Sequence, residues 1–73
     1  MEEKILKKLG KIISKIRKEK NLSQEKLAFA SGMSSNHIGE IERGNVNSSI
    51  VTVYKISKAL NIKLSKLLED LTF

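Results

Sequence analysis

The sequence contains no cysteine and no proline, and only four of its 73 residues are glycine. Without cysteine the chain can form neither a disulfide bond nor a thiolate metal site, and a reducing compartment suits it. Strand-rich folds need many tight turns, which proline and glycine favour, so the scarcity of both residues favours helices. Lysine, leucine and glutamate are abundant, and all three are good helix formers. The composition therefore predicts an all-α protein.

Long apolar runs and a secretory signal are absent as well. No stretch approaches the roughly 18 consecutive apolar residues that a membrane-spanning helix needs. The segment after Met1 lacks the apolar core and the small-residue cleavage site of a signal peptide. We therefore expect a cytoplasmic, nucleoid-associated protein. A chain of this length has room for one domain, so we expect residues 1–73 to form a single domain whose stability would gain from a partner.

Acidic residues are outnumbered by basic ones, which gives a formal net charge of +6 at pH 7. A small domain this basic attracts polyanions, with nucleic acid as the first candidate and an anionic membrane surface as the second. Five lysines recur at helical spacing near the start of the chain: Lys4, Lys8, Lys11, Lys15 and Lys18. A membrane-binding amphipathic helix is one interpretation of this stripe. We favour a solvated face that adds to DNA attraction, because the apolar face of the same helix must close the core.

Apolar residues at helical spacing, together with capping residues, predict five helices joined by short loops. The expected ranges are about Glu2 to Lys20, Ser23 to about Ser31, Ser35 to Arg43, Ser48 or Ser49 to Leu60, and Leu64 or Ser65 to Asp70. Residues that tolerate a left-handed backbone follow these helices: Asn21, Gly32, Gly44 and Asn61. The predicted core consists of Ile12, Ile13, Ile16, Leu22, Leu27, Ala28, Met33, Ile38, Ile41, Ile50, Val53, Ile56, Leu60, Ile62, Leu64 and Leu67.

The most informative unit runs from Ser23 to Gly44, where a turn containing Gly32 separates two short helices. Such a turn sets the helices about 90–120° apart, as in a helix-turn-helix. The small Ala28 lets them approach closely, so the second helix projects and can enter a major groove about 12 Å wide. The residues off its apolar face are expected to be exposed: Ser35, Asn36, His37, Gly39 and Glu40. A merely solvated face would usually carry lysine, and this one has none.

Several short runs match a known family: Ile16-Arg17, Lys20 to Gln24, Leu27-Ala28, Gly32 to Ser34, Ile41 to Gly44 and Lys58 to Ile62. On these runs the stretch from Leu9 to Leu68 resembles the Cro/C1-type (XRE-like) helix-turn-helix family of bacterial and phage transcriptional regulators. The run from His37 to Asn45 looks closest to the controller proteins of restriction–modification systems. The resemblance implies a compact five-helix, lambda-repressor-like fold. It also implies a symmetric homodimer that binds a palindromic operator in double-stranded DNA.

Carried over by position, the resemblance implies two sets of DNA contacts and one structural ion pair. The side chains that would contact bases are Ser35, Asn36, His37 and Glu40. Those that would contact the backbone are Gln24, Ser34, Arg43, Asn45, Asn47 and Ser49. Asparagine can bond adenine through two edges and glutamate can accept from the cytosine amine, which suits Asn36 and Glu40 to reading bases. Arg17 and Glu42 would form a partly buried pair linking the first and third helices.

Three residues depart from the usual family pattern. Ser48 stands where many members have proline, and Lys63 stands where a small residue usually caps the last helix. Gly39 costs the third helix roughly 1 kcal/mol relative to alanine. This glycine either permits a close approach to DNA or is simply tolerated.

A protein–protein module on the same fold, for example an antitoxin, is the alternative function. The feature that favours it is the apolar tail, Leu71 and Phe73, beside a short last helix. The same tail and helix are the expected homodimer interface. His37 is the only histidine, so we expect no metal site. No nucleophile–base pair or phosphate-cradling glycine loop is present, so we expect neither enzyme activity nor a cofactor.

Overall fold

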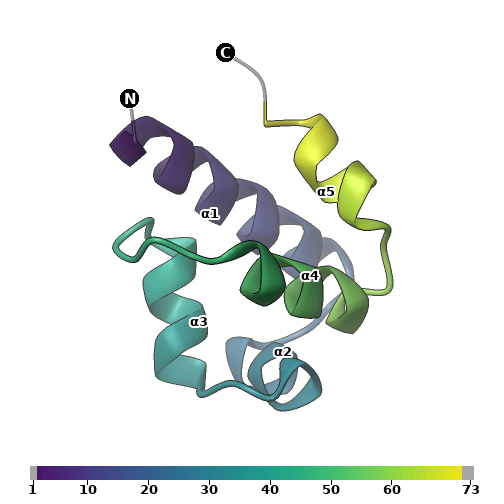
Figure 1. The fold of residues 1–73 in the computed structure, drawn as a ribbon. Helices are drawn as coiled ribbons and strands as arrows, with labels where there is room; N and C mark the ends of the chain where they lie inside the picture. The colour runs from purple at the N-terminus through teal and green to yellow at the C-terminus, as the bar shows by residue number, and fades with distance from the viewer. Residues whose placement is uncertain (1, 72–73) are drawn as a thin grey trace.

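The computed structural model describes residues 2–71, and these residues form five helices and no strand (Figure 1). The helices are α1 Glu2–Glu19, α2 Gln24–Ser31, α3 Ser35–Glu42, α4 Ile50–Ala59 and α5 Leu64–Glu69. Their bounds agree with the expected ranges to within about one residue at each end. Helix α1 packs against α3 and α5, α2 packs against α3 and α4, and α4 also packs against α5. The all-α prediction is confirmed.

Serine side chains cap the starts of three helices. The hydroxyls of Ser23, Ser34 and Ser49 accept backbone N–H bonds at 3.0, 3.0 and 3.1 Å, each from the residue three positions later. Each satisfies one of the free N–H groups of a first turn, which stabilises the helix by about 1 kcal/mol. Lys63, which precedes α5, makes no such bond. Helix α5 therefore begins at Leu64 without a side-chain cap from the residue before it.

The turns between helices use left-handed backbone at the predicted residues. Asn21 and Asn61 both have φ of 59°, while Gly32 and Gly44 have φ of 71° and 74°. Gly44 also needs its missing side chain, because a Cβ there would lie 2.8 Å from the Cα of Lys7. The chain thus leaves α3 by a turn that lies directly against the start of α1.

The core lies where the five helices meet, and most of it was predicted. Its buried apolar residues are Leu9, Ile13, Leu27, Ala28, Ile38, Ile41, Val53, Ile56, Leu60 and Leu67. The other expected core residues, with one exception, are half-buried and pack against this cluster: Ile12, Ile16, Leu22, Met33, Ile62 and Leu64. Leu9 also belongs to the core, because it is only 6% exposed, but it was not among the predicted core residues.

The exception is Ile50, which is 61% exposed, so its placement in the core was wrong. Ile50 lies one helical turn before the buried Val53, and periodicity alone therefore assigns both to one face. As the first residue of α4, however, Ile50 is not covered by any neighbouring helix. Its exposure leaves an apolar side chain at the surface beside Val51, which is 58% exposed.

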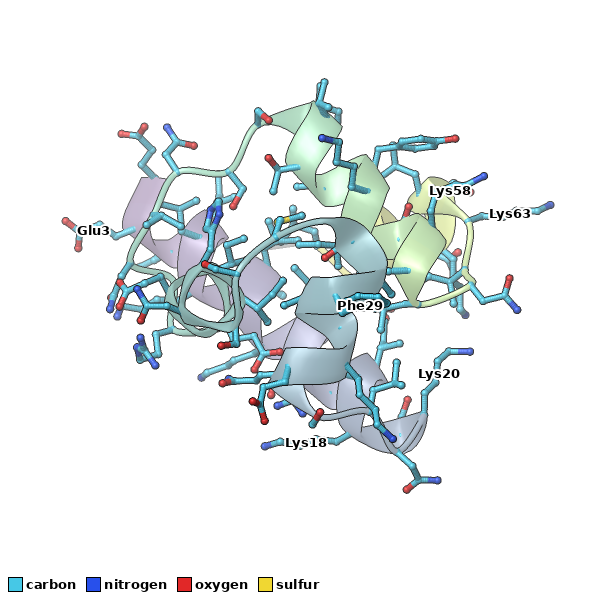
Figure 2. All side chains as sticks on the ribbon, turned by 90° about the horizontal axis from the view of Figure 1, so that it is seen from below. Glu3, Lys18, Lys20, Phe29, Lys58 and Lys63 are labelled. Atoms are coloured by element: carbon cyan, nitrogen blue, oxygen red, sulfur yellow. The ribbon has the colours of Figure 1, made fainter. Side chains whose placement is uncertain are left out.

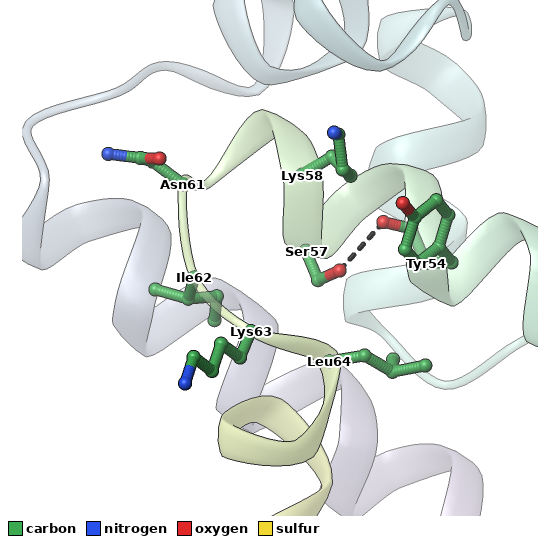
Figure 3. A pocket seen from close by; sticks show the side chains of 7 residues that line it. All are labelled: Tyr54, Ser57, Lys58, Asn61, Ile62, Lys63 and Leu64. Carbon is green, nitrogen blue, oxygen red and sulfur yellow. Dashed lines mark hydrogen bonds between the residues drawn. The ribbon is translucent and has the colours of Figure 1, made fainter.

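Helices α4 and α5 meet at an open hollow lined by Tyr54, Ser57 and Leu64 among others (Figure 3). The fully buried Ser57 is satisfied because its hydroxyl donates to the carbonyl of Tyr54 at 2.7 Å. No helix within residues 2–71 has the length and apolar character required to cross a bilayer. Within the same residues no group of three potential metal-ligating side chains comes together.

Candidate nucleic-acid interface

The turn between α2 and α3 fixes the direction of α3. The N–H of Met33 donates to the carbonyl of Ala28 at 2.8 Å, and the N–H of Gly32 donates to the carbonyl of Phe29 at 3.3 Å. The buried Ser31 hydroxyl closes the last turn of α2 by donating to the carbonyl of Leu27 at 2.7 Å. Ala28 is only 3% exposed, and α2 packs against α3. This arrangement is the predicted helix-turn-helix.

Helix α3 has an apolar inner side and a polar outer side. Ile38 is fully buried and Ile41 is 2% exposed, so this side closes the core. Ser35, Asn36 and His37 occupy the first turn and are all exposed. The structure therefore brings three of the predicted base-contacting residues together at one accessible end of α3.

Gly39, which was expected on the exposed face, is buried. A Cβ at this position would lie 3.2 Å from Nη1 of Arg43 and 3.6 Å from Oε1 of Gln24. The missing side chain thus makes room for two side chains that fold over the helix backbone. This glycine serves close packing within the protein, so its assignment to an open surface was wrong.

A buried polar network joins α1, α2 and α3. The Glu42 carboxylate accepts bonds from Nε and Nη2 of Arg17 at 2.6 and 3.1 Å and from Nε2 of Gln24 at 3.0 Å. Nη1 of Arg17 also donates to the carbonyl of Leu22 at 2.7 Å. The side chains of Arg17 and Glu42 are only 10% and 6% exposed. The pair predicted from the resemblance is present, and Gln24 extends it to the start of α2.

The protonation of Glu42 follows from this network. Burial alone would raise the pKa of this carboxyl group, because it disfavours the charged form. The hydrogen bonds from Arg17 and Gln24 and the positive charges of Arg17 and Lys18 outweigh burial and lower the pKa below its ordinary value. Glu42 is therefore ionised at neutral pH and fixes the relative positions of the helices around it.

A second ion pair lies at the surface of α3. Nη2 of Arg43 donates to Oε1 of Glu40 at 2.6 Å, and the two side chains are 56% and 35% exposed. Hydrogen bonds from Arg43 and Asn45 lower the pKa of Glu40. In the free protein, the carboxylate of Glu40, which is predicted to contact bases, is thus paired with Arg43, which is predicted to contact the DNA backbone.

Comparison with known proteins places this geometry in a family. The family model described as "Helix-turn-helix" matches residues 13–67. The chain belongs to the helix-turn-helix family of transcriptional regulators. It is 44% identical to control protein C.BamHI of Bacillus amyloliquefaciens over 86% of this chain and 79% of that protein. It is 41% identical to the ImmF control region 10 kDa protein of Bacillus phage phi105, over 84% of this chain and 68% of the relative.

The fold of this helix-turn-helix protein also matches that of a solved controller protein. The restriction–modification controller protein C.AhdI from Aeromonas hydrophila superposes with a TM-score of 0.83 and is 42% identical. The match covers 85% of this chain and 94% of that one. The predicted family, including its resemblance to controller proteins, is confirmed. Members of this family are DNA-binding regulators and not enzymes.

The remaining predicted contact residues flank α3 at both ends. Ser34 precedes α3 and is exposed, although its hydroxyl already accepts the N–H of His37. Asn45, Asn47 and Ser49 are exposed in the segment between α3 and α4. Gln24 is half-buried at the start of α2. The predicted contacts therefore lie along the chain from the residue before α3 to the residue before α4, with Gln24 on the neighbouring α2.

Sequence reasoning missed that α1 reaches this surface. A Cβ at Gly10 would lie 2.6 Å from the carbonyl oxygen of Ile41, and Lys7 contacts Gly44. The first half of α1 therefore lies against the end of α3. Gly10 was the available signal, because a glycine within a helical pattern often marks a close backbone approach.

Proposed function

We propose that this helix-turn-helix protein regulates transcription by binding a palindromic operator in double-stranded DNA as a homodimer, with α3 in the major groove. The observation that carries the proposal is the accessible polar end of α3, formed by Ser35, Asn36 and His37 above a buried apolar side. The names of C.BamHI and the ImmF control region protein, both regulatory, support this role. A DNA partner implies a cytoplasmic, nucleoid-associated protein.

Base contacts would come from Ser35, Asn36, His37 and Glu40. Asn36 can bond both exposed groups of adenine, and short hydroxyl or imidazole groups can donate or accept at base edges. Glu40 would exchange partners on binding. Arg43 is attracted to phosphate, and its departure would leave the Glu40 carboxylate available to a cytosine amine. A wrong base opposite Glu40 would leave that charge unpaired, which sharpens discrimination.

Backbone contacts would hold α3 in register. Gln24 lies at the start of α2, where free backbone N–H groups and the helix dipole favour a phosphate. Ser34 and Arg43 lie at the two ends of α3. The exposed residues of the following segment, Asn45, Asn47 and Ser49, would contact phosphates beyond it. Such contacts position the protein, whereas the first turn of α3 supplies sequence preference.

The start of α4 together with α5 is the proposed dimer interface. Ile50 and Val51 are exposed, and they directly follow the segment proposed to face the backbone. A two-fold contact through them would therefore keep both α3 helices on one side of the dimer. Tyr54 joins this surface to α5, because it lines the same hollow as the first residue of that helix (Figure 3). In the tail, Leu71 packs on its own core, and Phe73 lies outside the described residues.

Selection of bound duplexes from a random pool, followed by footprinting, tests the proposal. We expect an inverted repeat whose half-sites lie about 34–36 Å apart. Asn36→Ala should lose about 1–3 kcal/mol of discrimination at one position of each half-site and keep most non-specific affinity. Lys55→Ala, a change on the outer side of α4, is the control and should keep full discrimination. Unchanged base preference in the Asn36 variant would show that α3 does not read the sequence.

A protein–protein module is the second candidate function, and Phe29 favours it. This side chain is 90% exposed on α2 (Figure 2). It borders a groove with Tyr54, Lys55 and Lys58. Aromatic side chains, phenylalanine included, are enriched at protein–protein interfaces relative to the rest of the surface. Co-expression with neighbouring gene products should then give a complex that Phe29→Ser abolishes. If the wild-type protein and Phe29→Ser bound the same partners equally well, a protein-binding function of this groove would be excluded.

A further inference from the structure

Three exposed lysines of α1 form a basic strip at the edge of the proposed DNA-binding surface. Lys4, Lys7 and Lys11 follow one another at intervals of three and four residues, so they share one helix face. Together with Lys8 they line a single hollow that contains no acidic side chain. The strip consists of Lys4, Lys7 and Lys11, all of which are exposed.

Packing of α1 against the end of α3 sets the position of this strip. At Gly10 there is no room for a side chain, because a methyl group would collide with the carbonyls of Ile41 and Glu42. At Gly44 a methyl group would lie 2.8 Å from both Cα and Cγ of Lys7. In Figure 1 the start of α1 accordingly lies beside the turn that follows α3. Lys7 is therefore the direct neighbour of a glycine flanked by Arg43 and Asn45, two proposed backbone contacts.

The chemistry of the strip suits a phosphate chain better than a membrane. Glu2 and Glu3 occupy the first turn of α1, where negative charge stabilises the helix start, and they leave residues 2–11 with a net positive charge. The opposite side of α1 is buried through Leu9 and Ile13. A helix whose apolar side is enclosed in a core has none left to insert among lipids. Lysine heads on flexible stems can instead contact the phosphates of a duplex held by α3.

We propose that Lys4, Lys7 and Lys11 form an accessory phosphate-contacting strip that extends the DNA-binding surface beyond the helix-turn-helix. The inference rests on the proposed DNA-binding function and adds to it a set of contacts that carry no sequence preference. The strip lies before residue 13, where the match to the family model begins. It is therefore a feature of this chain outside the matched helix-turn-helix.

Two triple variants with the same net charge distinguish direct phosphate contacts of the strip from the general attraction of a basic protein to DNA. Lys4→Gln/Lys7→Gln/Lys11→Gln removes the strip. The control is Lys20→Gln/Lys55→Gln/Lys58→Gln, which removes three other exposed lysines. Lys55 and Lys58 border the groove of Phe29, and Figure 2 shows Lys20 and Lys58 on the side of the molecule away from α3. Each variant loses three of the six net positive charges. Circular dichroism melting of both proteins verifies that the fold is retained.

The measurement is the salt dependence of binding to the duplex selected by the wild-type protein. Each lost phosphate contact makes the slope of log K against log salt shallower by about 0.9. Loss of the strip should therefore flatten the slope by roughly 3 for one chain, and by about twice that for a dimer, while the preferred sequence stays the same. The control should change the slope by less than about 1.

Chemical acetylation of the wild-type protein gives a second readout that needs no substitution. DNA should protect the amines of Lys4, Lys7 and Lys11 and leave those of Lys55 and Lys58 reactive. The proposal would be overturned if the two triple variants had equal salt slopes, or if the lysine amines of the strip stayed reactive in the DNA complex. The proposed DNA-binding function would be unaffected by either result. A wild-type protein that selects no DNA would refute the proposed function and the strip together.

Discussion

Removal of the Glu42 carboxylate should destabilise the protein far more than removal of the solvent-exposed carboxylate of Glu40, two residues earlier. In Glu42→Ala, Arg17 keeps only its bond to the carbonyl of Leu22 while its side chain remains nine-tenths buried. Breaking a buried pair by removing one partner costs about 3–5 kcal/mol, because the remaining charge is left without its counter-ion. A domain of this length has a total stability of about 4–11 kcal/mol. The variant should therefore lose between about a quarter and all of the domain's stability.

Urea unfolding followed by circular dichroism measures this difference, and Glu40→Ala is the matched control. Both substitutions remove a glutamate of α3 that pairs with an arginine, but the pair of Glu40 with Arg43 is exposed to solvent. Exposed pairs contribute only about 0.2–1 kcal/mol. A third protein, Arg17→Met/Glu42→Leu, should recover most of the lost stability because neither partner is left charged. A loss below about 1 kcal/mol in Glu42→Ala would refute the structural role of the buried network.

The pH dependence of stability gives an independent check of the same network. The folded-state pKa of Glu42 is below its ordinary value of 4.5, so its ionised form stabilises the native state. That stabilisation is fully present above pH 4.5 and is lost as the pH falls through the lower, folded-state pKa. The wild-type protein should therefore lose stability below about pH 4.5 more steeply than Glu42→Ala. Parallel acid-unfolding curves for the two proteins would contradict the assigned direction of the pKa shift.

Two further pairs of substitutions test the packing. Gly44→Ala should cost about 1–3 kcal/mol, because it combines a positive φ with a clash against Lys7, whereas Gly32→Ala meets open space and should cost less. Thermal melts that rank these two variants in the opposite order would contradict the close approach of α1. Leu27→Ala should cost about 2–5 kcal/mol because Leu27 is fully buried, while Phe29→Ala, two residues later and 90% exposed, should change stability by less than about 0.5 kcal/mol. Equal effects in this pair would show that α2 is rotated relative to the structure described above.

The local features of this fold could be predicted because they depend on residues close together in the sequence. Helical periodicity and the serine caps define α2, α3 and α4 to within about one residue. A cap bonds to the third residue after it, so a window of four residues contains both partners. The exposed first turn of α3 also followed from such local patterns, since apolar residues marked the opposite side of the helix.

The order, type and ends of the helices and the polar side of α3 therefore follow from patterns within the sequence. Three features depend instead on how the helices pack: Ile50 is exposed, Gly39 is covered by Arg43 and Gln24, and Lys7 lies beside Gly44. The difference arises from distance along the chain. Periodicity and capping act over a few residues, whereas burial at a helix end and contact between α1 and the end of α3 depend on how distant segments pack.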